Sequence, residues 1–218
     1  MTIGIPGYLT GANSFGVGIS YLEFVKDYLY CSDLRILLPD SPLFTDIDIL
    51  LLTGGLDVNP ERYGEIPSYR TDKPDPIKEY FDVHVLPLYI EQRTKILGIC
   101  RGCQSLAVTF GESLYQSMWH ETNKQEDPYS GVHYLHVFSE PNKKIKVNSR
   151  HHQSIRVPVN KDSRVEVLAT HKDFRNHIEV IKIKDYPAYG LQYHPEDLSE
   201  NSGMTYTESI IKRLINEK

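Results

Sequence analysis

Cysteine is scarce in this chain, and long apolar runs are missing. Three cysteines among 218 residues are too few for a framework of disulfides. The longest apolar run, around Ile49 to Leu52, is far too short to cross a bilayer. The start, Met1 to Pro6, does not combine a basic stretch with an apolar one, so no signal peptide is predicted. We therefore expect a protein without membrane contact, in the reducing cytoplasm, where a cysteine thiolate survives.

Positive charge is also in short supply. The 24 lysines and arginines are outnumbered by 29 acidic residues, which gives a net charge of −5. The basic residues are scattered, so the electrostatic footprint of a nucleic-acid-binding protein is missing. With 40% hydrophobic residues, the chain can bury one substantial core. A single domain over residues 1–218 is the simplest prediction.

The most informative stretch is an apolar strand that leads directly into a cysteine. Residues 95–104 read KILGICRGCQ, with a glycine two residues before and two residues after Cys100. Glycines let a tight strand-to-helix turn close, and the following helix would point its N–H groups at the sulfur and favour thiolate over thiol. This pattern is typical of a nucleophile elbow. The structural alternative is a small buried cysteine at the end of a core strand.

A second segment, Tyr189 to Glu196, supplies the partners that a cysteine nucleophile needs. His194 can take the thiol proton and later return one to a leaving amine, and Glu196 can fix the tautomer of the imidazole. The two residues are two apart, so an extended backbone points them the same way, with Pro195 holding it rigid. In isolation, such a motif is more often an exposed turn after a strand.

Together, these two segments resemble the class I glutamine amidotransferases, whose signature joins Gly-x-Cys-x-Gly-x-Gln to a later His-Pro-Glu. Within that superfamily, the chain is similar to the γ-glutamyl-γ-aminobutyrate hydrolases, also called the C26 peptidases. The closer match rests on Thr53 to Pro60, on Arg101 and on Val147 to Gln153. The resemblance also places Lys78, Glu79 and Asp82 where the family has an Arg-Asp pair and a downstream Glu. Lys lacks the planar fork of Arg.

The resemblance implies a role for individual residues. Three of them would form a catalytic triad: Cys100 as nucleophile, His194 as general base and acid, and Glu196 as its orienting partner. Backbone N–H groups would form the oxyanion hole, in the turn at Gly55 and Leu56 and at Arg101 after the nucleophile. Candidate substrate-binding residues are Gln104, His152 and Gln153.

The activity that the resemblance implies is cleavage of the γ-glutamyl amide bond of glutamine or of a γ-glutamyl amine. A γ-glutamyl thioester would form on the cysteine, and glutamate would leave with ammonia or an amine. Because no synthetase domain accompanies this chain, a free-standing hydrolase is favoured. The alternatives are a glutaminase subunit that feeds ammonia to a separate synthetase, a lone reactive cysteine that works without His-Glu, and a binding protein without turnover. A homodimer is also left open.

The nine histidines raise the question of a metal site. His133 and His136 lie three residues apart, and His151 and His152 are adjacent, but no carboxylates or cysteines complete a ligand set at the usual spacing. Cys103, three residues after the proposed nucleophile, has no second cysteine pair to join it in a zinc site. We therefore expect no metal and no cofactor, and we expect Cys103 to fill the core.

Strand-like and helix-like segments alternate over the first half of the chain, and the tail carries an amphipathic helix. This pattern predicts an α/β fold, a flavodoxin-like, doubly wound and mostly parallel sheet with helices on both faces, and a β-rich antiparallel C-terminal half. Strands are expected at 3–6, 34–38, 47–52 and 95–99, and helices at 20–29, 76–91, 102–110 and 205–215. Pro87 should kink or end its helix. A polar loop is expected at 116–131, and antiparallel strands at 136–138, 144–147, 164–169 and 177–183.

Overall fold

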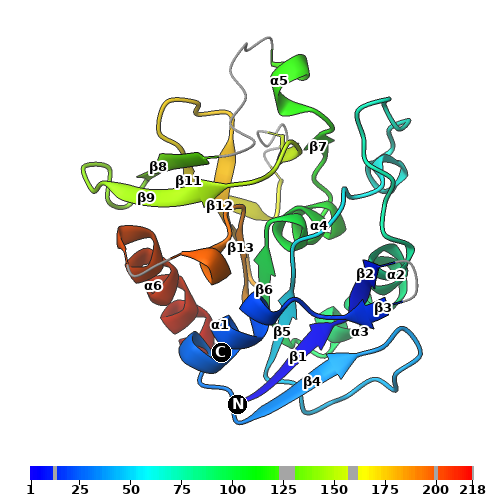
Figure 1. Ribbon diagram of the computed structural model, residues 1–218. Coiled ribbons are helices and arrows are strands. Elements are labelled where there is room, and N and C mark those ends of the chain that lie inside the picture. The colour runs from blue at the N-terminus through cyan, green and yellow to red at the C-terminus, as the bar shows by residue number, and fades with distance from the viewer. Residues whose placement is uncertain (12–13, 123–130, 157–161, 199–200, 218) are drawn as a thin grey trace.

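A single mixed sheet of nine strands forms the centre of the molecule (Figure 1). The computed structural model describes residues 1–11, 14–122, 131–156, 162–198 and 201–217. The strand order is β4-β1-β5-β6-β13-β12-β11-β8-β9. The first five strands run parallel: β4 (Asp33–Leu37), β1 (Thr2–Pro6), β5 (Ile49–Leu52), β6 (Lys95–Ile99) and β13 (Ala188–Leu191).

The other half of the sheet is antiparallel, as the alternating patterns predicted. It consists of β12 (Ile178–Ile183), β11 (Val165–His171), β8 (Gly131–Val137) and β9 (Ile145–Ser149). The parallel and antiparallel halves of the sheet meet at β13, which pairs parallel with β6 and antiparallel with β12. This strand was not assigned from the sequence, although it leads directly to the His-Pro-Glu motif.

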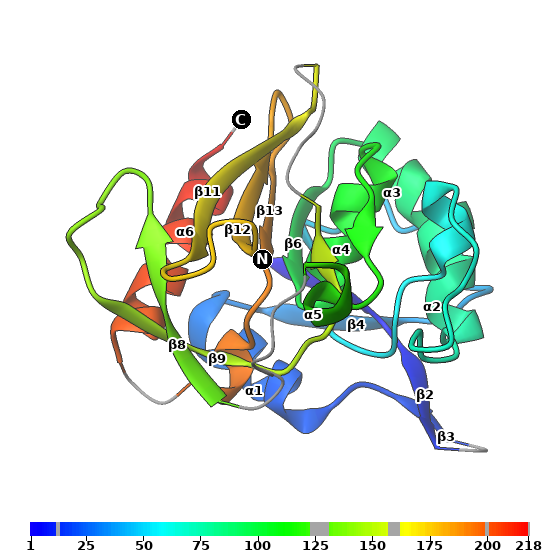
Figure 2. The same cartoon turned by 90° about the horizontal axis from the view of Figure 1, so that it is seen from above.

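Helices cover both faces of the sheet, so the predicted fold class is confirmed (Figures 1 and 2). On one face lie α1 (Ile19–Tyr28) and α6 (Ser202–Asn216), and on the other α4 (Arg101–Thr109) and α3 (Leu86–Glu91), with α2 (Pro76–Tyr80) beside them. Each face has its own apolar core. Burying a leucine- or isoleucine-sized side chain stabilises the fold by roughly 1.5–3 kcal/mol. None of the helices in the described part of the chain is long and apolar enough to cross a membrane.

The helix predicted for residues 76–91 is continuous in space but irregular. A π-helical turn at Phe81–Val85 separates α2 from α3, and Pro87 follows directly in the first turn of α3. Proline has no N–H for the carbonyl four residues earlier, and its ring clashes there, so a widened turn relieves the conflict. The helix does not end at Pro87, because α3 continues to Glu91, and the irregularity is the π-helical turn that precedes the proline.

The predicted loop at 116–131 is wrong at its start. A one-turn helix, α5 (Met118–Glu121), forms there because the Glu121 carboxylate accepts the N–H groups of Gln116 and Ser117 at 2.7 and 3.1 Å. The remaining residues of that prediction, 123–130, lie outside the described residues, and β8 begins at Gly131.

Two short ribbons were also missed from the sequence, because each is only a few residues long. They are the hairpin β2 (Tyr8–Gly11) with β3 (Ser14–Gly16), and the pair β7 (Leu114–Tyr115) with β10 (Ser154–Ile155). The remaining elements are two 3₁₀ turns, η1 (Pro60–Tyr63) and η3 (Pro195–Asp197).

Candidate active site

Cys100 lies in a strained turn between β6 and α4. Its φ and ψ are 52° and −109°, a conformation that glycine favours and other residues rarely adopt. Close packing explains the flanking glycines: a methyl carbon on Gly102 would lie 2.1 Å from the carbonyl oxygen of Leu52, and one on Gly98 would lie 2.6 Å from that of Gly102. The Cys100 N–H donates to the carbonyl of Leu191 at 2.7 Å. Cys100 is the residue directly before α4, so it lies at the N-terminal end of that helix.

His194 and Glu196 approach Cys100 from the neighbouring strand. Leu191 at the end of β13 pairs with Ile99 at the end of β6, so the segments that follow the two strands leave the sheet at the same edge. His194 Nδ1 lies 2.6 Å from Glu196 Oε1, and the Glu196 side chain is only 2% exposed. This arrangement brings together the three residues of the predicted triad.

An amide side chain fixes the backbone of His194. Asn148 Nδ2 donates to the His194 carbonyl, and Asn148 Oδ1 accepts the His194 N–H, both at 2.8 Å. Asn148 lies in β9, the far edge strand of the sheet, so this clamp ties the histidine to the antiparallel half of the molecule. Asn148 belongs to the segment Val147 to Gln153 on which the family resemblance rests, but this pairing with His194 was not predicted.

The charges around His194 favour its protonated form. Burial alone would lower the pKa of His194, but the negative charge and hydrogen bond of Cys100, followed by those of Glu196, raise it to about 10. The imidazole therefore favours its protonated form at neutral pH, in the pocket that Cys100 also lines. A protonated histidine in the same pocket as a cysteine can serve as a proton donor.

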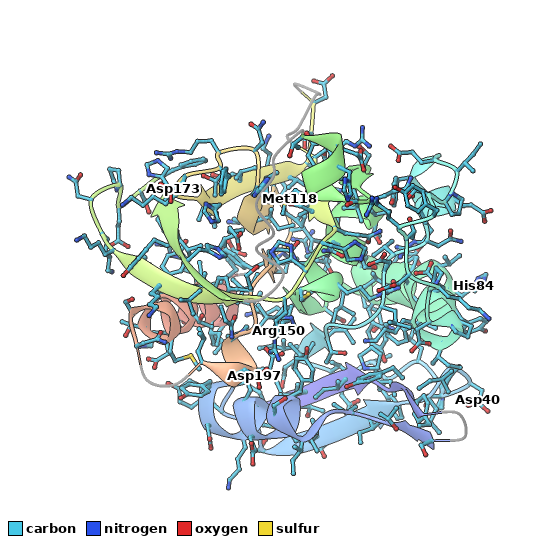
Figure 3. The ribbon with its side chains drawn as sticks, turned by 45° about the horizontal axis from the view of Figure 1, so that its top comes forward. Asp40, His84, Met118, Arg150, Asp173 and Asp197 are labelled. Carbon is cyan, nitrogen blue, oxygen red and sulfur yellow. The ribbon has the colours of Figure 1, made fainter. Side chains whose placement is uncertain are left out.

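A pocket of about 300 Å³ opens over the three residues. Its walls include Tyr8, Tyr21 and Gly55, besides Cys100 and His194. Arg150 and Asp197, labelled in Figure 3, also line it and form an ion pair. Because both of these side chains are more than a third exposed, their pairing contributes little to stability. The pocket presents charges of both signs to whatever enters it.

The turn after β5 contributes Gly55 to the lining of this pocket. A methyl carbon on Gly54 would lie 3.1 Å from His194 Cε1 and 3.5 Å from Cys100 Cβ, so the turn passes close to both residues. The Gly54 N–H is already occupied, since it donates to the Tyr21 hydroxyl at 2.9 Å. Of the predicted oxyanion donors, Gly55 lines the pocket, Leu56 is half exposed and Arg101 is the first residue of α4.

The predicted substrate residues all bind other parts of the protein. Gln104 Nε2 donates to the Gln153 carbonyl at 3.0 Å and to Gln192 Oε1 at 3.1 Å. Gln153 Oε1 accepts the Val58 N–H at 3.1 Å. His152 Nε2 lies 2.8 Å from Asp57 Oδ1, an ion pair that raises the pKa of His152. These contacts hold the loops behind the pocket, and substrate contact by the three residues stays a prediction.

A buried cluster of charges lies directly behind the nucleophile. Arg101, 3% exposed, binds Glu79 at 2.5 Å and Asp82 at 2.7 Å, and Arg62 also binds Asp82 at 2.7 Å. Burial would raise the pKa of Asp82, but Arg101 and Arg62 outweigh it and hold the pKa below its ordinary value. Two arginines thus neutralise two carboxylates. Arg62 was not found from the sequence, because it comes from η1, far away along the chain.

Lys78 is a third cation in this region, and it too is buried. Its Nζ donates to Thr53 Oγ1 at 2.7 Å and lies 4.3 Å from the centre of the Tyr8 ring. Burial, assisted by the like charge of Arg101, lowers its pKa to about 7. Through its bond to Thr53, Lys78 therefore supports the turn that contains Gly54 and Gly55.

Possible metal ligands gather at two places in the described part of the chain. Asp57, Asp72 and His152 place one ligand atom each within 4.8 Å of one another, as do His194, Glu196 and Asp197. The sequence did not bring the first group together, because Asp57 and Asp72 come from a different loop than His152. The short contacts within both groups are those of ion pairs. Cys103 is fully buried, and a methyl carbon on Gly190 would lie 2.5 Å from its sulfur, which confirms it as a core residue.

The fold and the elbow define a class of protein, the glutamine amidotransferase-like α/β proteins with a cysteine between strand and helix. A glutamine amidotransferase from Thermotoga maritima superposes with a TM-score of 0.62 at 16% identity and covers 99% of this chain and 98% of its own. A likeness at this identity shows the fold.

The family follows from sequence comparison. The family model of peptidase C26 matches residues 41–196, and the chain belongs to this family. The glutamine amidotransferase-like protein YvdE of Lactococcus lactis is 33% identical over 166 residues, 70% of this chain and 67% of its own length. The γ-glutamyl-γ-aminobutyrate hydrolase PuuD of Escherichia coli is 26% identical over 204 residues, 80% of this chain and 77% of its own. The resemblance stated from the motifs is thereby confirmed.

Proposed function

We propose that this protein is a cysteine hydrolase that cleaves the γ-glutamyl amide bond of glutamine or of a γ-glutamyl amine. The observation that carries the proposal is the convergence, in one pocket, of a strained cysteine and a carboxylate-bound histidine that follow two adjacent parallel strands. Membership of the peptidase C26 family and the relative PuuD support the same chemistry.

The proposed reaction has two halves. The Cys100 thiolate attacks the γ-carbonyl carbon, a C–S bond forms, and the oxygen becomes an anion that the N–H groups of Gly55 or Leu56 and of Arg101 stabilise. His194 gives its proton to the departing nitrogen as the C–N bond breaks. It then takes a proton from water, which attacks the thioester, breaks the C–S bond and releases glutamate. Glu196 holds the imidazole in place throughout.

The leaving group separates the hydrolase from the second candidate, a glutaminase subunit. An amidotransferase passes ammonia to a synthetase, and a hydrolase releases an amine into water. The charged rim of the pocket, with Arg150 beside Asp197, favours an amine that carries polar or charged groups of its own. We therefore favour γ-glutamyl amines over glutamine as substrates.

Glutamate release by the purified chain tests the proposal. The substrates are glutamine, γ-glutamyl-aminobutyrate and a panel of other γ-glutamyl amines, and Cys100→Ala is the control. We expect release from at least one γ-glutamyl amine, and none from the Cys100→Ala protein. Slow release from glutamine alone would favour the glutaminase subunit. Release from no substrate, or equal release by Cys100→Ala, would refute the hydrolase.

A further inference from the structure

Tyr21 is a buried polar residue for which the proposed reaction has no role so far. It comes from α1 and is 6% exposed. Its hydroxyl oxygen accepts the Gly54 N–H at 2.9 Å, and its side chain lines the pocket with Cys100, His194 and Glu196. A tyrosine hydroxyl that accepts one hydrogen bond still has a proton to donate.

A buried carboxylate lies in the same pocket. Glu196 uses Oε1 for His194, while its second oxygen, Oε2, is buried and has no partner among the described residues. A buried carboxylate oxygen without a donor is destabilising, so a neutral hydroxyl group in the same pocket is favourable. Burial and the negative charges of Glu196 and Cys100 raise the pKa of Tyr21 well above its ordinary value, so the hydroxyl keeps its proton.

We infer that Tyr21 is a positioning residue whose hydroxyl group holds the Gly54–Gly55 turn in place beside Cys100 and His194. The inference rests on the proposed function, because it assigns the hydroxyl a part in keeping the oxyanion turn at a fixed distance from the reacting residues. The Tyr21 hydroxyl and the His194 ring both lie close to Gly54, which supports this inference. A methyl carbon added to Gly54 would lie 2.8 Å from the Tyr21 oxygen and 3.1 Å from His194 Cε1.

This link has a second consequence for the oxyanion hole. Since Tyr21 takes the Gly54 N–H, that group is turned away from the substrate, and the next N–H groups along the turn are left to bind the oxyanion. A turn held at one end by a hydrogen bond is already in place before the transition state forms, which is how such donors lower a barrier. The hydroxyl therefore acts on the rate through its neighbours.

The test is the variant Tyr21→Phe, which removes one oxygen atom and keeps the ring. Tyr186→Phe is the matched control, because Tyr186 is equally buried and donates its hydroxyl proton to the Thr94 carbonyl at 2.6 Å, in a part of the protein away from the pocket. For Tyr21→Phe we expect kcat for the best γ-glutamyl amine to fall at least tenfold while KM changes less than threefold. Tyr186→Phe should keep its kcat. A general loss of stability would reduce both variants, so an equal fall in both overturns the inference, as does a Tyr21→Phe protein within twofold of wild type.

A second readout needs no substrate and separates this inference from the proposed function. Iodoacetamide alkylation of Cys100 is followed by peptide mass, with Cys31, which is partly exposed, as the reference in the same chain. We expect Tyr21→Phe to slow labelling of Cys100 relative to Cys31 at least threefold, and Tyr186→Phe to leave it unchanged. If the wild-type protein cleaves no γ-glutamyl amide, the hydrolase fails and this labelling ratio alone decides the role of Tyr21. An unchanged ratio then overturns it.

Discussion

Cys100 and Arg101 are neighbours in the chain, but they belong to two buried polar clusters of different kinds. One cluster opens to a pocket, and the other is closed. Cys100 has a strained backbone and faces a pocket that it shares with a histidine whose pKa is raised to about 10. Arg101 turns to a closed group of ion pairs with Glu79 and Asp82, in which opposite charges cancel. The charge cluster therefore anchors the base of the elbow, so that Cys100 can adopt a reactive conformation.

The largest effect on activity is expected from a substitution in the cluster that faces the pocket. Glu196→Gln removes the negative charge beside His194, and we expect kcat to fall roughly 10²–10⁴-fold, because the imidazole loses its orienting partner. Loss of that charge also lowers the pKa of His194 from about 10. Activity that requires the protonated histidine is lost as the pH rises through this pKa, so the alkaline limb of the pH–rate profile should move to lower pH. An unmoved limb would contradict the assignment of His194.

A substitution in the closed charge cluster should lower the stability of the protein. Asp82→Asn leaves Arg101 and Arg62 without one of their two carboxylates, and breaking a buried ion pair on one side costs about 3–5 kcal/mol. The measurement is urea denaturation, with Asp27→Asn at an exposed position of α1 as control. A loss as small as that of the control would show that the cluster does not anchor the elbow.

Lys78 lies between the two clusters, and its effect should depend on pH. Its pKa is about 7 in the folded protein against 10.5 in an ordinary setting, so between these values the unfolded chain binds a proton that the folded chain lacks. Stability of the wild type relative to Lys78→Met must therefore rise with pH, by roughly 2–4 kcal/mol between pH 7 and 10. Denaturation of both proteins across this range measures the difference. A difference that does not change with pH would show that the ammonium keeps its ordinary pKa.

The smallest expected effect is a difference in stability that arises from backbone strain at Cys100. Glycine adopts the φ and ψ of residue 100 without penalty, whereas a side chain there costs of order 1 kcal/mol or more. Cys100→Gly should therefore be more stable than Cys100→Ala by about 1 kcal/mol, the reverse of the usual order. Thermal unfolding of the two variants decides. If Ala is the more stable, the turn stores no strain.

Local patterns predicted much of the fold and the reactive residues. The cysteine between glycines marked the elbow, and His194 with Glu196 two residues on marked its partner, because both signals lie within a few neighbouring residues. The residues that support them could not be found this way. Tyr21, Arg62 and Asn148 meet the site only after parallel crossovers and strand pairing bring distant segments together. The spacing of apolar residues along the chain does not reveal contacts between distant segments. The strand β13 was missed because its four residues are all buried and show no alternation.

The most direct test of the central claim is detection of the covalent intermediate on Cys100. The protein is mixed with the γ-glutamyl amine it cleaves fastest, quenched in acid within the first turnover, digested and examined by mass spectrometry. We predict one γ-glutamyl group on the peptide that contains Cys100, lost on incubation at neutral pH and absent from Cys100→Ala. Glutamate release with no adduct on Cys100 in the wild type, or an adduct on another residue, would contradict the account.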